Sequence, residues 1–336
     1  MNQPNLFKFA TSELSQDAFI CWLLSWASPQ NKEIDMKLHI CALDFINALF
    51  AKFPQQKHPS SIEKVIIKKQ DANIDVLCII NDHFVIIIED KTNTVNHSNQ
   101  LANYLSEIEG RSYNKDCIFP IYLKTFDQAS YKDVIEKNKY QVFSRQDFLS
   151  VLNKGNNSGI ENAIFQDFRQ HLQSIQNNVE SYLRLPIFPK GANPKWKTQA
   201  WTGFYIHLQK ELGSGLWQKV NNEAGGFMGF WWGNQSGKPY LLLEEDRLCF
   251  KIKVDDPTQR KKIRTYWYKL IKSKQADAGL TLTKPLRFGS GKNMTVIVAN
   301  GDYRQVRDDG CIDMEATVNK LKKIEAFLHE IQKHTA

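Results

Sequence analysis

Two apolar runs separated by Asn81-Asp82, within residues 74–91, constrain the fold of this chain most. Apolar runs of this length, bounded by turn residues, are typical of buried strands joined as a hairpin. The second run ends in Glu89-Asp90-Lys91. Because side chains alternate along a strand, Glu89 and Lys91 share one face and Asp90 takes the other. A strand buried on both faces should not end in charges unless these are solvated, paired or bound to metal.

Asp75 stands at the start of the first run. If the two strands pair through the turn, Asp75 and Glu89 lie at the same edge of the sheet. Carboxylates are hard ligands for Mg²⁺ or Mn²⁺, which polarises a phosphate and lowers the pKa of a bound water. Lys91 would orient or help deprotonate that water, or neutralise charge on the phosphate. The alternative is a solvated strand end, because so short a pattern also occurs by chance.

The surrounding pattern predicts an α/β domain over 1–188, with a mixed central sheet flanked by helices. Proline and glycine residues near position 190 mark the boundary to a second domain, 189–336, which we expect to be α+β. In the first domain we expect helices at 12–27, 33–52, 97–109, 146–152 and 160–183, and strands at 65–68, 74–80, 84–89, 118–123 and 140–143. In the second we expect helices at 195–212, 258–273 and 317–331, and strands at 227–232, 240–243, 248–254 and 294–298.

The net charge of +8 is unevenly distributed along the chain. Residues 1–188 hold 19 Lys and Arg against 21 Asp and Glu, whereas residues 189–336 hold 25 against 15. A basic half beside a slightly acidic half suits a polyanion-binding surface next to a metal-binding carboxylate cluster. A charge excess that only keeps the protein soluble is an equal alternative.

The second half contains one basic and aromatic helix that suits a phosphate backbone. Its basic residues, which we predict to contact nucleic acid, are Arg260, Lys261, Lys262 and Arg264. Such contacts supply affinity with little sequence information. The alternative is a solvated helix face with inward-packed aromatic rings. We expect Trp231-Trp232 in a core or an interface rather than as a platform for base stacking.

Six dispersed cysteines, without a Cys-x-x-Cys pair, indicate reduced thiols rather than a disulfide framework or a zinc site. The first ten residues lack the pattern of a secretory signal, and no apolar run approaches the roughly 20 residues that span a bilayer. We therefore expect a cytoplasmic protein that does not bind membranes.

Three motifs occur in order along the chain: Ile74-Asp75, Ile88-Glu89-Asp90-Lys91, and Asn99-Gln100-Leu101 with Tyr104. Together they resemble the PD-(D/E)XK nuclease superfamily, in a bacterial branch of uncharacterised or defence-associated members. The similarity covers roughly residues 10–150. It implies a restriction-endonuclease-like core and Mg²⁺-dependent cleavage of DNA. Ile74 stands where the family has proline, which removes no ligand.

The resemblance implies five site residues. Asp75 and Glu89 match the metal-binding acids, and Lys91 matches the catalytic lysine. Gln100 matches a glutamine on the next helix near the active site. Glu13 matches an acidic residue that several branches place on the first helix as an extra metal ligand.

Helical spacing places Tyr104 and His97 on one face with Gln100, where Tyr104 would contact nucleic acid or pack in the core. Asp17 shares a face with Glu13, although acidic residues in a first turn also suit the helix dipole. The remaining weaker candidates are Asp71, Asp90, Lys68 and Lys69.

We therefore predict a metal-dependent nuclease acting on DNA in phage defence or DNA processing. Mg²⁺ or Mn²⁺ is its expected cofactor and nucleic acid its partner. Two alternatives stay open. One is a nuclease-like module that binds without cleaving, and the other is a structural protein whose aromatic second half forms a homo-oligomer interface.

Overall fold

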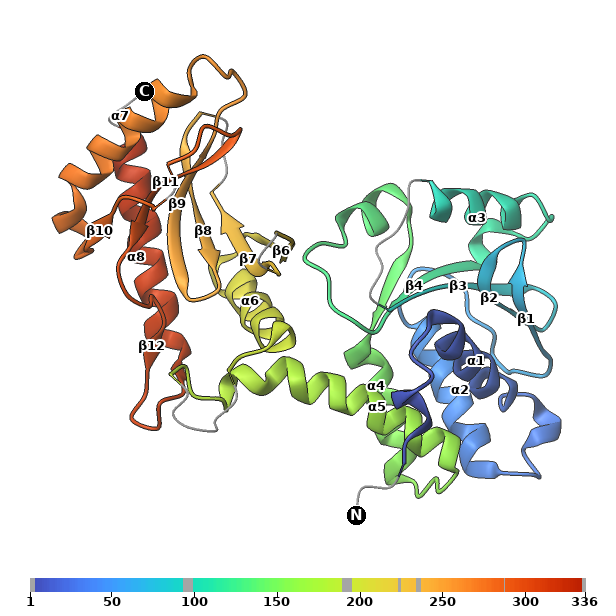
Figure 1. Cartoon of the computed structure of the whole chain (residues 1–336). Helices are drawn as coiled ribbons and strands as arrows, with labels where there is room; N and C mark the ends of the chain where they lie inside the picture. Colours follow the sequence, from blue (N-terminus) through green and yellow to red (C-terminus); the bar gives the residue numbers. More distant parts are fainter. Residues whose placement is uncertain are drawn as a thin grey trace. The chain divides into compact units, whose positions relative to one another are not determined.

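The computed structural model describes residues 4–92, 99–188, 195–222, 225–233, 237–286 and 288–333. The chain forms two compact units, Met1–Gln176 and Asn177–Ala336, and the division falls within a long helix (Figure 1). Each unit has its own sheet. No helix in the described ranges is long and apolar enough to cross a bilayer.

The first unit is built on a five-stranded mixed sheet. Its strands are β1 (Val65–Asp71), β2 (Ile74–Ile80), β3 (Phe84–Lys91), β4 (Ile118–Lys124) and β5 (Gln141–Ser144), in that order across the sheet. The first three strands are antiparallel, whereas β3, β4 and β5 run parallel. Its helices are α1 (Glu13–Ser25), α2 (Met36–Phe50), α3 (Gln100–Glu109), α4 (Arg145–Asn157) and α5 (Ala163–Val179). The predicted mixed sheet flanked by helices is confirmed.

Helices lie on both faces of this sheet (Figure 1), and each face packs into a hydrophobic core. Ile86 and Ile88 of β3 face a core shared with α1 and α2, whereas Val85 and Ile87 face a core shared with α3. Both faces are dry, so β3 is a central strand whose charges can only emerge at its end. Between β2 and β3 the chain turns through Asn81 and Asp82, which both adopt positive φ, as short polar residues tolerate.

The second unit carries a six-stranded antiparallel sheet with the order β10-β11-β9-β8-β7-β6. The strands are β6 (Leu216–Val220), β7 (Phe227–Trp232), β8 (Pro239–Glu244), β9 (Arg247–Lys253), β10 (Leu282–Thr283) and β11 (Asn293–Ala299); β12 (Gln305–Val306) and β13 (Ile312–Asp313) form a separate pair. The helices are α6 (Thr198–Leu212), α7 (Arg260–Ser273) and α8 (Met314–Lys333). The expected α+β class is confirmed, although the sequence analysis missed β6, β10, β12 and β13.

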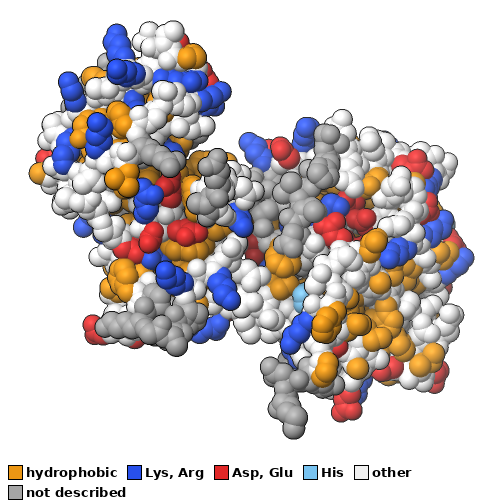
Figure 2. All heavy atoms as spheres, in the orientation of Figure 1, with side chains coloured by type: hydrophobic (Ala, Val, Ile, Leu, Met, Phe, Trp, Pro, Cys, Tyr) orange, Lys and Arg blue, Asp and Glu red, His pale blue; other side chains and the backbone are white. Residues whose placement is uncertain are grey.

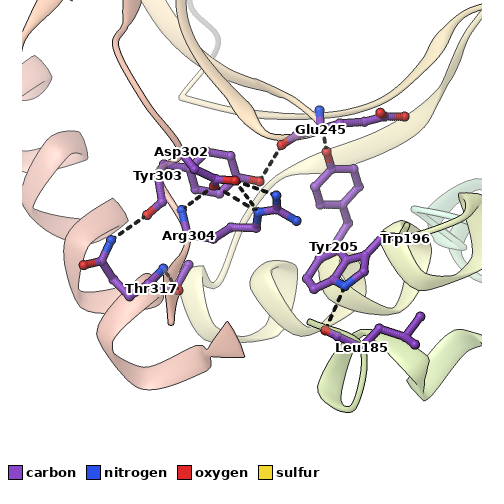
Figure 3. Close-up of polar contacts among 9 residues, drawn as sticks. Leu185, Trp196, Tyr205, Glu245, Asp302, Tyr303, Arg304 and Thr317 are labelled. Carbon is purple, nitrogen blue, oxygen red and sulfur yellow. Dashed lines mark hydrogen bonds and ion pairs between the residues drawn. The ribbon is translucent and has the colours of Figure 1, made fainter. Parts of the chain in front are cut away.

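Buried tyrosines fix the turn between β8 and β9 in the second unit (Figure 3). The hydroxyl of Tyr205 on α6 accepts a hydrogen bond from the Glu245 amide at 3.2 Å, and that of Tyr303 donates to the Glu245 carbonyl at 2.8 Å. Glu245 has a φ of 54°, which a side chain rarely adopts without such support. Beside it, Arg304 pairs with Asp302 at 2.5 Å.

Candidate active site

Three carboxylates surround the ammonium of Lys91 at the end of the central strand. Lys91 Nζ lies 2.6 Å from Glu89 Oε1, 3.7 Å from Asp75 Oδ2 and 3.8 Å from Glu13 Oε2. Glu89 and Lys91 share a face of β3, as the alternation predicts. The four side chains that the sequence analysis singled out from β2, β3 and α1 therefore meet at one point.

Strand pairing brings Asp75 to this point. Val76 lies opposite Ile88 in the β2–β3 ladder, so Asp75 stands at the level of the end of β3. Its Oδ2 accepts a hydrogen bond from the Asp90 amide at 2.9 Å. This bond fixes the Asp75 carboxylate beside the catalytic strand.

Glu13 reaches the same point from the other side of the sheet. It is the first residue of α1, where the Ser12 side chain caps the helix. Its Oε1 accepts hydrogen bonds from the amide and the hydroxyl of Thr92, at 3.0 and 3.3 Å. Thr92 immediately follows β3, so this contact ties the start of α1 to the end of the catalytic strand.

The electrostatics of Glu89 are those of a site short of positive charge. Glu89 is fully buried, and burial, reinforced by the nearby Asp75 carboxylate, raises its pKa to about 8. Within the described part of the chain, its Oε2 has no hydrogen-bond partner. Burial lowers the pKa of Lys91, but its contacts with the carboxylates, above all Glu89, outweigh burial and shift that pKa upward. Lys91 is therefore protonated in this arrangement.

A second pair of acids lies on the opposite face of β3. Asp90 is fully buried and accepts a hydrogen bond from the Gln16 amide, which in turn accepts one from Thr125. Burial raises the pKa of Asp17 to about 6, and it raises that of Asp90 as well. Asp90 thus faces α1, the helix that carries Gln16 and Asp17, rather than the Lys91 cluster.

Gln100 and Tyr104 form one hydrogen-bonded pair on α3. The Gln100 amide donates to the Tyr104 hydroxyl at 2.8 Å. Burial raises the pKa of Tyr104, and the negative charges of Glu89 and Asp75 add to this effect. Tyr104 also packs against the core on this face of the sheet. The Tyr104 hydroxyl therefore lies near enough to Glu89 and Asp75 for their charges to affect its pKa. His97 lies outside the described residues.

The weaker candidates on β1 have other partners. Asp71 makes a two-pronged ion pair with Arg111, with N–O distances of 2.9 and 2.8 Å, and this pair lowers its pKa to about 2. Lys68 also pairs with Asp71 at 3.2 Å. Lys69 donates to the Leu14 carbonyl of α1 at 3.3 Å. These contacts link β1 to α1 and to Arg111, which follows α3.

Lys124, which the sequence analysis missed, is a second buried lysine at the same sheet edge. It ends β4 directly opposite Lys91 in the parallel ladder, and only 2% of it is exposed. Burial lowers its pKa to about 8, against the opposing effect of the Glu13 and Asp90 carboxylates. A charge closing the apolar run 118–123 was the available signal, because β3 shows the same pattern.

The basic residues predicted to contact nucleic acid differ in exposure. Lys261 and Lys262 are exposed. Arg260 donates to the carbonyl groups of Val254, Asp255 and Ser290. Arg264 is 2% exposed, and its guanidinium donates to backbone carbonyls and stacks on a phenylalanine ring. Figure 2 shows further Lys and Arg side chains spread over the visible face of the second unit.

The chemistry of this cluster fits a divalent cation. Within the described ranges, no three Asp, Glu, His or Cys side chains are arranged to hold one ion. Mg²⁺, however, is commonly held by one or two carboxylates, with water and substrate phosphate completing its shell. Asp75 and Glu89 supply such a pair, and Glu89 Oε2, a buried oxygen that accepts no hydrogen bond within the described residues, is an available ligand atom.

A family model of the PD-(D/E)XK nuclease superfamily matches residues 4–183, which span all of α1 to α5 and the whole five-stranded sheet. No curated protein and no solved structure matches the chain. The family match covers more than half of the chain and includes the strand that carries Glu89 and Lys91. The chain therefore belongs to the PD-(D/E)XK nuclease superfamily.

Proposed function

We propose that this protein is a Mg²⁺- or Mn²⁺-dependent nuclease that hydrolyses phosphodiester bonds in DNA. One observation carries the proposal: the Lys91 ammonium lies within 4 Å of three carboxylates at the end of a central strand buried on both faces. Of these groups Glu89 and Lys91 are buried, and their desolvation is costly, so stability alone does not account for the cluster. Family membership supports the nuclease chemistry.

Asp75 and Glu89 would hold the metal, with Glu13 as a further ligand. The ion would supply Lewis-acid polarisation of the phosphate and a bound water of lowered pKa. Glu13 Oε1 accepts hydrogen bonds from Thr92, which hold this carboxylate beside the end of β3. The Gln100 amide, oriented by Tyr104, would position substrate or water.

The upward shift in the pKa of Lys91 disfavours one of its three proposed roles, deprotonation of the water. A protonated ammonium cannot accept a proton, but it can orient water and neutralise the charge that develops on the phosphate. We therefore assign Lys91 to these two roles, both of which depend on its charge. The exposed Lys261 and Lys262, with Arg260, are proposed to contact the phosphate backbone, and Arg264 would support the helix that presents them.

The test is cleavage of plasmid and oligonucleotide DNA by purified full-length protein in Mg²⁺ or Mn²⁺. Lys91→Ala should abolish cleavage while circular dichroism and the melting temperature show a folded protein. Lys91→Arg keeps the charge and should retain measurable cleavage if Lys91 acts by charge. Full activity of Lys91→Ala would refute the assignment.

A catalytically silent binding module is the rival hypothesis. Titration of Mn²⁺ into wild type and Glu89→Ala by calorimetry separates the two, because a nuclease should bind the ion through Glu89. Asp44→Asn is the matched control, since Asp44 pairs with an exposed lysine away from the cluster. Equal heats for all three proteins, with no cleavage, would favour the binding module.

We propose DNA processing or phage defence as the biological setting of the nuclease, and the cytoplasm as its compartment.

A further inference from the structure

The two faces of the second unit's sheet are packed differently. On one face α8 covers the sheet, and the ring of Phe327 meets that of Phe250 edge-on at 6.4 Å. On the other face a small cluster around Tyr240 and Leu242 is formed, among described residues, by strand residues alone. Apolar and aromatic side chains that stay partly exposed on such a face can mark a binding surface.

A groove of about 400 Å³ lies on this second face, lined by residues of β6, β7, β8 and β9 and the start of β11. Its described lining includes three lysines, Lys251, Lys253 and Lys292, and no acidic residue. Lys292 is half exposed and pairs with Asp255 outside the lining at 2.6 Å. Lys251 reaches Glu244 at 3.2 Å. The three lysines outnumber the two acids that pair with them, so the groove keeps a small excess of positive charge.

The chain runs from the groove to the start of α7. The Val254 amide donates to the Lys292 carbonyl at 2.9 Å, and Arg260, the first residue of α7, donates to the Val254 carbonyl at 3.1 Å. Two exposed acids, Asp255 and Asp256, lie between Val254 and Arg260. The positive charge that a ligand would meet is therefore that of the groove lysines.

Two half-buried aromatic rings, Phe227 and Trp231, line the same groove. They stand on the same face of β7, four residues and thus roughly 13 Å apart. Gly229 lies between them on this face and adds no side chain. By the same alternation Trp232 points to the opposite face and is 2% exposed. Both tryptophans were expected from the sequence in a core or an interface; Trp231 packs against the cluster around Tyr240 and Leu242 and also lines the groove.

We propose that this groove binds an unpaired stretch of nucleic acid, with phosphates against the lysines and bases stacked on Trp231 and Phe227. Flat aromatic rings beside lysines are how single strands are held without sequence preference. In a duplex the faces of the bases are already stacked. An acidic peptide would match the lysines but leave the rings without a stacking partner. The inference takes its ligand class from the proposed nuclease function but does not require cleavage.

The experiment is binding of full-length protein, in EDTA, to a fluorescent single-stranded oligonucleotide, its duplex and a poly-glutamate peptide. Lys253→Glu should weaken single-strand binding and reduce the slope of log affinity against log salt by about 0.7 for each lost phosphate contact. Lys322→Glu is the matched control, because Lys322 is exposed on α8. It should leave affinity and slope unchanged.

Trp231→Ala should weaken single-strand binding by about fivefold or more, the loss expected for one stacked base. Gly229→Ala keeps the test decisive if Trp231→Ala does not fold. The added methyl group would meet the Phe227 ring at 3.4 Å and Val220 at 3.5 Å, which are ordinary contacts, and it adds bulk beside the Phe227 ring. It should weaken binding without lowering the melting temperature.

Equal affinity for single strand and duplex would overturn the proposal, as would equal effects of Lys253→Glu and Lys322→Glu. If poly-glutamate displaces the oligonucleotide equally well from wild type and from Trp231→Ala, the groove is a site for an acidic peptide instead. Because EDTA prevents metal-dependent cleavage, single-strand binding by a protein that never cleaves would sustain this inference while the proposed function fails. Cleavage without groove-dependent binding would do the reverse.

Discussion

Replacing Glu89 by Gln should stabilise the metal-free protein at alkaline pH while abolishing cleavage. Glu89 is fully buried beside Asp75, and its pKa is raised from 4.5 to about 8. Between these values the folded state keeps a proton that the unfolded chain releases. The free energy of unfolding therefore falls as pH rises through this window, by up to about 1.4 kcal/mol per pH unit. Glutamine cannot release that proton, so this loss disappears.

The expected size follows from the width of that window. Between pH 5 and pH 8 the unfolding free energy of Glu89→Gln should gain about 2–4 kcal/mol relative to wild type, allowing for the coupling between Glu89 and Asp75. For a unit of this size that corresponds to roughly 2–4 °C in melting temperature per kcal/mol. Urea and thermal denaturation in EDTA at pH 5, 6.5 and 8 measure it.

Added Mg²⁺ supplies the second half of the test. An ion held by Glu89 should stabilise wild type at pH 8, by about 2.7 kcal/mol at a hundred times its dissociation constant, and should not stabilise Glu89→Gln. If Glu89 serves only as the ion-pair partner of Lys91, the variant should instead lose about 3–5 kcal/mol at every pH, and Mg²⁺ should shift neither protein. That result would refute the reasoning. Asp44→Asn, which removes a surface charge, should change stability by less than about 1 kcal/mol.

Three further outcomes are expected. Tyr104→Phe removes the hydroxyl that accepts the Gln100 amide at 2.8 Å, so kcat should fall about tenfold with little change in melting temperature, whereas unchanged kcat would exclude a positioning role. Arg145→Met should cost about 3–5 kcal/mol of stability in urea denaturation, because Arg145 is buried and pairs with Asp127 at 2.8 Å; cleavage per folded molecule should persist. Gly203→Ala would place its Cβ 1.9 Å from the Val179 carbonyl oxygen and should lower the stability of the second unit by about 3 kcal/mol. Gly110→Ala is the control, because its nearest contact would be 3.4 Å away. Thermal denaturation should show it to be nearly neutral.

The β2–β3 hairpin and the shared face of Glu89 and Lys91 were predictable from the sequence. Both depend on local rules: the turn needs residues that tolerate positive φ, and side chains alternate along a strand whatever surrounds it. The position of Asp75 opposite Glu89 follows from the same turn. These rules act within a few residues, so a single sequence contains them.

Contacts between distant elements were decided only by the tertiary structure. Lys124 lies opposite Lys91 because of the register between β3 and β4, two parallel strands that are joined through α3. No local sequence pattern specifies that register. The position of Glu13 is likewise not specified by any local pattern. Its carboxylate reaches the site because the start of α1 packs against Thr92, the residue that follows β3. The sequence by itself determined which charges end the central strand. The packing of helices against the sheet determined which other charges meet them, because burial and register depend on the whole fold.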